Sequence, residues 1–375
     1  SPALRRWQQQ ERLLATYRNC GARKNTKMPT TRLFALLSVF LAALISAAAS
    51  ADSARIGPPV PGIEQAELLS PFGGRATFSP DGRKIAFVGK TYGDAYELDL
   101  ATRKVRNLTR GFPHQGIMRI QYLPDGNFLV TAPRINNGTN TRAHLEMWLL
   151  DKTLERGLQP LGEQVFEGIA VSRQRNLIAW TVIEPALGPR ENWQLAFVRP
   201  TKRYMAEISY ENGRPRIANK REIMATLPRE CSFIEPQDFR ENDAELVYSC
   251  MGLTGSGGIL ISVMGNTLAS DRNVTYYRKA GEYDEVEGIA PGGDWAAVEC
   301  GKQDKPGLPE LDICRLELRE GGALSVLVRG RTPGSTDDIS NPIVSPDGKW
   351  LVFQRSNSAS GDIGEGYGIY RLLLP

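Results

Sequence analysis

Short apolar runs alternate with turn residues from residue 63 to the end of the chain. At residues 76–88, 118–131 and 342–354, the turn sequence Pro-Asp-Gly separates two apolar runs. Proline presets the dihedral angle of the second turn position, aspartate bonds back to the backbone, and glycine adopts the positive φ. Each of the three copies therefore predicts a β-hairpin.

Three weaker copies of this hairpin lie between the second and the last. Their turns are residues 172–175 (SRQR), 240–243 (REND) and 290–293 (APGG), and each precedes an apolar run. Equivalent turn positions are 44, 49, 68, 50 and 55 residues apart. These positions are Asp81, Asp125, Gln174, Asn242, Gly292 and Asp347. Because a third and usually a fourth apolar run follows, each repeat predicts a four-stranded antiparallel meander.

Six repeats of this size predict an all-β fold, a six-bladed β-propeller built from four-stranded antiparallel blades. The sixth repeat ends at Pro375 after only three apolar runs. Residues 65–69, which precede the first repeat, offer a fourth strand. This N-terminal strand would complete the last blade and close the ring, which removes exposed sheet edges. We assign residues 63–375 to the propeller.

Residues 28–51 have the layout of a secretory signal peptide. Arg32 precedes an apolar run of about 17 residues, and the segment ends in Ala49-Ser50-Ala51, which fits an A-x-A cleavage site. A membrane-spanning helix is the alternative, but the run is at the lower limit for spanning and is rich in Ala and Ser. We expect a periplasmic or secreted protein with no stable membrane span after cleavage. Residues 1–27 are interpreted as a non-native upstream extension, and residues 52–62 as a linker.

The net positive charge of the chain, +4, comes from the residues before the repeats. Residues 1–51 hold eight basic residues and one acidic residue, which leaves 38 basic and 41 acidic residues in the remainder. A body with a net charge near −3 gives no electrostatic reason for binding nucleic acid. The 37 glycines and 24 prolines agree with many turns and short elements.

Four cysteines follow the signal peptide: Cys231, Cys250, Cys300 and Cys314. An even number of cysteines in an exported chain indicates disulfide bonds. The strand layout places Cys231 opposite Cys250 in the fourth repeat, and Cys300 opposite Cys314 in the fifth. We predict these two pairs, with four buried free thiols as the alternative. Zinc is disfavoured because the chain has only two histidines and no Cys-x-x-Cys pair.

The first repeat carries a recognisable phrase. Residues 78–87 read F-S-P-D-G-x-x-I-A-F, followed by Asp-Leu-Ala-Thr at residues 99–102 and Arg-x-Leu-Thr at residues 106–109. This phrase resembles the WD-like Pro-Asp repeat of TolB-like proteins and of prolyl-oligopeptidase-type peptidases. The resemblance covers residues 63–375. The α/β domain of TolB-like proteins and the hydrolase domain of the peptidases, with its Gly-x-Ser-x-Gly motif, have no counterpart in the sequence.

Polar residues on the predicted inner strands, with one loop histidine, are the candidates for a binding site at the channel mouth. Two arginines suit an anionic group, whereas Asp238, Glu287 and Asn341 can converge near the axis and hold a calcium ion. The alternative is that these charges only pair with one another across the channel. The candidates are Arg75, Arg119, His114, Asp238, Glu287 and Asn341.

The resemblance implies a binding scaffold in the cell envelope, with a protein, peptide or other envelope component as its partner. We expect a monomer with no cofactor. We also expect no catalytic residue, because a Ser-His-Asp site would need His114, a lone loop histidine, or His144, which has no evident partner. One alternative is a metal-dependent propeller hydrolase or lactonase with calcium in the channel. Another is a stand-alone propeller related to prolyl-oligopeptidase-type peptidases.

Overall fold

The computed structural model describes residues 61–136, 141–184, 193–253, 259–303, 310–330, 337–357 and 367–374. The predicted upstream extension, the signal peptide and most of the linker lie outside these residues. Val60–Pro375 forms one compact unit. Within the described part of the chain, no helix has the length and apolar character that crossing a membrane requires.

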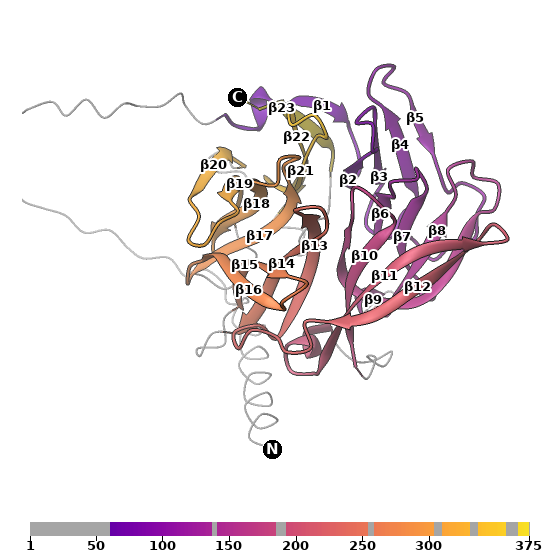
Figure 1. Cartoon of the computed structure of the whole chain (residues 1–375). Helices are drawn as coiled ribbons and strands as arrows, with labels where there is room; N and C mark the ends of the chain where they lie inside the picture. The colour runs from indigo at the N-terminus through magenta and orange to yellow at the C-terminus, as the bar shows by residue number, and fades with distance from the viewer. Residues whose placement is uncertain are drawn as a thin grey trace, which may run out of the picture. The chain divides into compact units, whose positions relative to one another are not determined.

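The described residues form an all-β structure with three short 3₁₀ helices (Figure 1). Four sheets have four antiparallel strands and one has seven. The first repeat contains β2 (Gly74–Phe78), β3 (Lys84–Val88), β4 (Ala95–Asp99) and β5 (Val105–Asn107). The seven-stranded sheet contains β6 (Arg119–Tyr122), β7 (Phe128–Pro133), β8 (Leu145–Leu150), β9 (Leu158–Val171), β10 (Leu177–Ile183), β11 (Thr201–Glu211) and β12 (Arg214–Ile223).

The remaining three sheets follow the fourth, fifth and sixth repeats. The fourth contains β13 (Phe233–Arg240), β14 (Glu245–Leu253), β15 (Ile259–Thr267) and β16 (Arg272–Arg278). The fifth contains β17 (Glu282–Ile289), β18 (Trp295–Lys302), β19 (Glu310–Glu317) and β20 (Leu324–Val328). The sixth contains β21 (Asp337–Val344), β22 (Trp350–Asn357), β23 (Ile369–Leu373) and β1 (Glu67–Ser70). The 3₁₀ helices are η1 (Ile63–Gln65), η2 (Thr141–His144) and η3 (Trp193–Phe197).

The predicted turn chemistry is present in the hairpins. In the first repeat, Asp81 Oδ1 accepts hydrogen bonds from Ser79 Oγ (2.6 Å) and from the backbone N of Arg83 (3.1 Å), and Gly82 has a φ of 69°. Asp347 makes the equivalent pair of contacts at the same distances in the sixth repeat. Local sequence therefore fixes these turns, which set the register of the strands on either side.

Strand β9 belongs to two repeats at once, which differs from the six separate meanders that the sequence predicts. Its first half pairs with β8, from Leu158 to Val165, and its second half pairs with β10, from Phe166 to Val171. No turn interrupts the strand, so the fourth strand of the second repeat continues directly into the first strand of the third. Sharing this strand joins the two repeats into one seven-stranded sheet.

The first strand of the described chain pairs with the last. Strand β1 is antiparallel to β23, with Glu67 opposite Arg371, and the two lie beside β22 in Figure 1. Strand β1, which lies in the segment predicted as the fourth strand of the sixth repeat, is therefore the fourth strand of that sheet. Leu69 of β1 packs in a buried cluster with residues of the first and sixth repeats. The other buried members are Ala76, Ile85, Phe87, Leu98, Val352 and Ile369.

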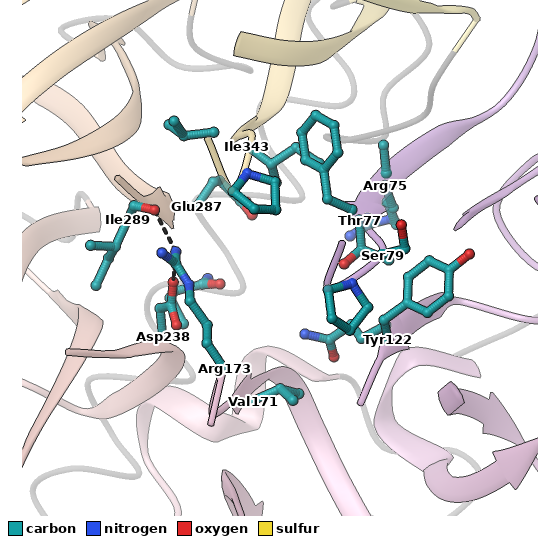
Figure 2. Close-up of a pocket in the computed structure, with 18 of the residues that line it drawn as sticks. Arg75, Thr77, Ser79, Tyr122, Val171, Arg173, Asp238, Glu287, Ile289 and Ile343 are labelled. Carbon is teal, nitrogen blue, oxygen red and sulfur yellow. Dashed lines mark hydrogen bonds and ion pairs between the residues drawn. The ribbon is translucent and has the colours of Figure 1, made fainter. Parts of the chain in front are cut away.

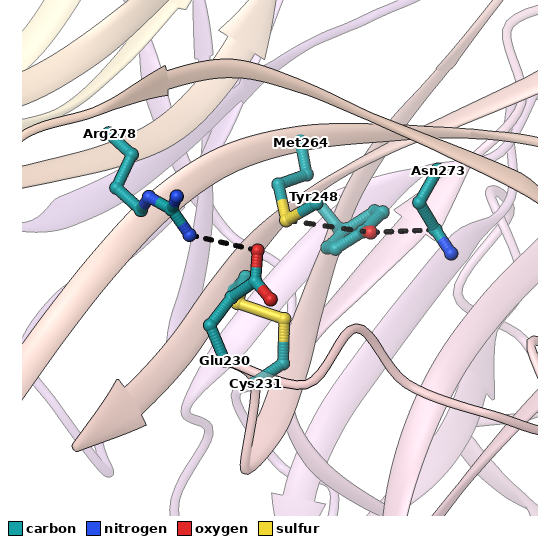
Figure 3. Close-up of a disulfide and its surroundings, with 7 residues drawn as sticks. Glu230, Cys231, Tyr248, Met264, Asn273 and Arg278 are labelled. Atoms are coloured by element: carbon teal, nitrogen blue, oxygen red, sulfur yellow. Dashed lines mark hydrogen bonds and ion pairs between the residues drawn. A yellow bond between two sulfur atoms is a disulfide. The ribbon is translucent and has the colours of Figure 1, made fainter.

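Both predicted disulfide bonds are present. Cys231 is bonded to Cys250 with a Cα–Cα distance of 5.3 Å, and Cys300 is bonded to Cys314 with a Cα–Cα distance of 5.9 Å. Figure 3 shows the first bond, with the ion pair between Glu230 and Arg278 (3.0 Å) beside it. In each case the bond closes a loop within one repeat.

Candidate functional site

A cavity of about 300 Å³ collects most of the residues that the sequence singled out. Its walls include Arg75 from β2, Arg119 from β6, Asp238 from β13, Glu287 from β17 and Asn341 from β21. Each of these strands opens its repeat, so the cavity lies where the first strands approach one another. Five of the six candidates therefore share one site, as Figure 2 shows for Arg75, Asp238 and Glu287.

His114 is placed outside this cavity. Its Nε2 lies 2.9 Å from Asp94 Oδ1, and its Nδ1 accepts a hydrogen bond from the backbone N of Gly116 at 3.0 Å. The loop before β6 folds back onto the β3–β4 connection, where the backbone of Ile117 also bonds to Gly93. The imidazole therefore ties two loops of neighbouring repeats together instead of facing the site.

The rim of the cavity is made of turn residues. The second turn position, which is proline in four of the repeats, lines the cavity in every one of these four. The four residues are Pro80, Pro124, Pro291 and Pro346. Together with Phe78, Tyr122, Ile289 and Ile343 they give the cavity an apolar wall around its charged groups.

Arg173 lines the cavity and was missed by the sequence analysis. Its Nη2 donates to Asp238 Oδ2 at 2.7 Å and to the carbonyl oxygen of Ile289, as the dashed lines in Figure 2 show. Arg173 occupies the position in the SRQR turn that proline occupies in the turns of residues 79–82 and 345–348. Aligning the degenerate turn with the clear ones would have placed this arginine at the rim.

Asp238 and Glu287 each face an arginine from a different repeat. Burial raises the pKa of Asp238, and Arg173 opposes that rise by favouring the ionised form. Burial also raises the pKa of Glu287, to about 7, against the effect of Arg119. Glu287 Oε2 lies 3.8 Å from Arg119 Nη1, and Glu287 Oε1 accepts a hydrogen bond from Asn341 Nδ2 at 2.9 Å.

The expected calcium ligands do not assemble as one set. Asp238 is held by Arg173 on one side of the cavity, whereas Glu287 and Asn341 bond to each other. Among the residues that the structure describes, the carboxylates that offer three oxygens within 4.8 Å of one another are Glu285, Glu287 and Glu299. Arg119 already supplies positive charge beside this group, which weakens the case for a divalent cation.

Arg119 is the group best placed to act on a ligand. Its side chain is 17% exposed, and its contact with Glu287 at 3.8 Å is too long for a hydrogen bond. Within the described residues its guanidinium has no hydrogen-bond acceptor. A guanidinium presents five N–H donors in a planar fork that matches a carboxylate. The arrangement therefore provides an anion-binding group inside a cavity with both polar and apolar walls.

No protein-family model matches this chain, and no curated protein sequence matches it. Solved structures similar to it include the β-propeller domain of the Trilobed protease from Pyrococcus furiosus, 11% identical over 79% of this chain and 76% of that one, with a TM-score of 0.45. The C-terminal WD40 domain of Sif2 is 10% identical over 85% and 100%, with a TM-score of 0.46. The calcium-binding protein regucalcin from Agrobacterium tumefaciens is 12% identical over 82% and 92%, with a TM-score of 0.48. Similarity at this level says nothing of what this chain binds.

Proposed function

We propose that this chain is an exported six-bladed β-propeller that binds a carboxylate group of a peptide or protein partner in the cavity described above. The observation that carries the proposal is Arg119, whose guanidinium faces the cavity without a hydrogen-bond acceptor among the described residues. The two disulfide bonds are compatible with export, since such bonds persist in oxidising compartments. The repeat phrase, similar to that of TolB-like proteins, supports an envelope scaffold.

Contacts between the first strands of successive repeats support the six-bladed ring of this proposal. β2 contacts β6, β9 contacts β13, β13 contacts β17, β17 contacts β21, and β21 contacts β2. Gln121 Nε2 of β6 donates to the carbonyl oxygen of Ile169 of β9 at 3.0 Å, which supplies the remaining step. A closed series of six first strands is the arrangement around the channel of a six-bladed propeller. In this proposal, the pairing of β1 with β23 closes the ring.

The cavity suits a short segment of a larger partner. Its volume of about 300 Å³ lies at the lower end of the range for small-ligand pockets. The turn prolines and aromatic residues of the rim offer apolar contact to the residues next to the bound carboxylate. A carboxyl terminus or an acidic side chain of a peptide therefore fits both the charge and the size of the site.

The test uses peptides of defined sequence. A displayed library of short peptides with free carboxyl termini is selected against the purified protein, and the affinities of the selected peptides are measured by calorimetry. Hydrogen bonds to charged groups contribute about 1.5–3 kcal/mol, so we expect Arg119→Gln to weaken binding by about tenfold to a hundredfold. Amidation of the carboxyl group should cause a similar loss.

Arg110→Gln is the matched control, because Arg110 is exposed and lies outside the cavity lining. This variant should bind the selected peptides as tightly as the unmodified protein does. Equal binding by Arg119→Gln and the unmodified protein would show that the carboxylate is not recognised at this site.

A further inference from the structure

Three glutamates meet at the wall of the cavity, and one of them, Glu287, lines it. Glu285 and Glu287 lie on β17, and Glu299 on β18 is directly opposite Glu285 in the antiparallel pair. Their carboxylate oxygens lie within 4.8 Å of one another. Glu299 is 1% exposed and Glu285 is 7% exposed. Ionised carboxylates this close together, with so little access to water, repel one another strongly.

Charged and polar groups from five strands surround the cluster. The hydroxyl of Tyr283 donates to Glu285, and Asn341 donates from Nδ2 to Glu287 and from its backbone N to Glu299 Oε1, the latter at 2.6 Å. The charged and titratable neighbours are Tyr283 on β17, Glu235 on β13, Arg75 on β2 and Arg119 on β6. Two arginines oppose the three carboxylates of the cluster, so at least one negative charge is left without compensation when all three are ionised.

Glu299 has an atom with no partner. Its Oε1 accepts the hydrogen bond from Asn341, but its Oε2 is buried and has no hydrogen-bond partner within the described residues. The Oδ1 of Asn341, a residue that is 6% exposed, is equally without a partner there. A buried carboxylate oxygen without a donor is costly, whereas a carboxyl group that carries a proton at Oε2 has a donor to offer.

The sixth repeat has a neutral side chain, Gln354, at the position that Glu299 occupies in the fifth repeat. Gln354 stands seven residues after Asp347, as Glu299 stands seven residues after Gly292. Gln354 Oε1 accepts a hydrogen bond from the backbone N of Arg75 at 2.6 Å, just as Glu299 Oε1 accepts one from Asn341. Arg75 and Asn341 both have positive φ, 53° and 48°.

The position therefore links one repeat to the first strand of the next. In both repeats the side chain at this position accepts a hydrogen bond from a backbone N of the next first strand. In the sixth repeat the acceptor is the neutral amide of Gln354. Gln354 Nε2 in turn donates to Ser340 Oγ at 3.0 Å. A protonated glutamate matches glutamine in shape and likewise has one acceptor and one donor end.

We propose that Glu299 keeps a proton at neutral pH, which makes the contact between β18 and β21 a proton-dependent clasp. Burial raises the pKa of Glu299 well above its ordinary value, and the charges of Glu287 and Glu285 raise it further. Loss of this proton gives Glu285, Glu287 and Glu299 a negative charge each, beside β21, which carries Asn341. Because Glu287 and Asn341 also line the cavity, alkaline pH should loosen one wall of the site. This inference does not depend on the ligand proposed above.

The test compares the melting temperature of the full chain with that of Glu299→Gln from about pH 5 to about pH 9. The folded protein binds a proton that the unfolded chain has released, so its stability falls as the pH rises from the ordinary glutamate pKa of about 4.3 through the raised value. Glutamine lacks this titration. We expect the melting temperature of Glu299→Gln to exceed that of the unmodified protein by a margin that grows with pH.

Glu320→Gln is the matched control, because Glu320 is an exposed residue of the same repeat. Its pH profile should follow that of the unmodified protein. A Glu299→Gln profile that runs parallel to the unmodified one at a lower melting temperature would overturn the proposal. So would calcium that raises the melting temperature of the unmodified protein at about pH 8 but not that of Glu299→Gln, because the cluster would then hold a metal ion instead of a proton.

A second measurement does not require the variant to fold. Carbon-13 labelling of the glutamate carboxyl groups lets their titration be followed by NMR in the unmodified protein. We expect at least one glutamate to keep the chemical shift of a protonated carboxyl group at about pH 7, well above the ordinary pKa of about 4.3. Titration of every glutamate below about pH 5.5 would refute the proposal.

Discussion

Leu69 on β1 tests the junction between the two ends of the repeat region. Its side chain is 8% exposed and packs against Ile85 and Phe87 of the first repeat and against Val352 and Ile369 of the sixth. Replacing leucine with alanine removes three carbon atoms, each worth about 0.8 kcal/mol when buried. The transfer term is thus about 2.4 kcal/mol, and the cavity left behind adds to it. We expect Leu69→Ala to lower the free energy of unfolding by about 3 kcal/mol.

The assay is equilibrium unfolding in guanidinium chloride, with the disulfide bonds left intact in every sample. Leu68→Ala is the matched control on the same strand, because Leu68 is 48% exposed. That variant should change the free energy of unfolding by about 0.5 kcal/mol or less. If Leu69→Ala costs no more than Leu68→Ala, β1 does not join the two ends of the chain in the way described here.

Two further predictions concern the fifth repeat. Burial raises the pKa of Asp284 to about 7, and both of its carboxylate oxygens lack a hydrogen-bond partner among the described residues. The folded state therefore holds a proton that the unfolded state loses, and stability falls by about 1.4 kcal/mol per pH unit between about pH 4 and about pH 7. Asp284→Asn should be more stable than the unmodified protein at about pH 8 in thermal unfolding, and equal pH profiles would contradict this. Replacing Cys300 and Cys314 together with alanine opens a loop of 14 residues, which should cost about 3 kcal/mol by the loop-entropy estimate. Denaturation of this double variant beside the unmodified protein measures the loss, and an unchanged midpoint would show that the bond does not stabilise the fold.

The repeats could be found from sequence because their signals are local. Proline, aspartate and glycine specify a turn within four residues, and the apolar runs on either side specify the strands. The continuity of β9 could not be found in this way. The fourth strand of one repeat and the first strand of the next normally have turn residues between them, but residues 158–171 form one strand. Only pairing with both neighbours shows that the strand serves two repeats.

The sequence predicted those site residues whose location at the cavity follows from their position within the repeat. Arg119, Glu287 and Asn341 lie on first strands, and first strands line the cavity. The role of Arg173 depends on a turn that has lost its proline, so the pattern did not reveal it. The position of His114 depends on how a loop folds against the neighbouring repeat, where Asp94 accepts a hydrogen bond from the imidazole. Such contacts between repeats follow from packing and leave no periodic signal in the sequence.

The pairing of β1 with β23 has a consequence for the order in which the protein folds. Glu67 and Arg371 face each other in this sheet and are joined by a hydrogen bond, although 304 residues separate them in the chain. During synthesis, β1 emerges first and has no partner until Ile369–Leu373 has been made. Contacts between such distant segments form slowly, because a long loop must close before they contribute. The newly made chain therefore carries β1 without its partner strand for most of its synthesis, and this sheet can be completed only at the end.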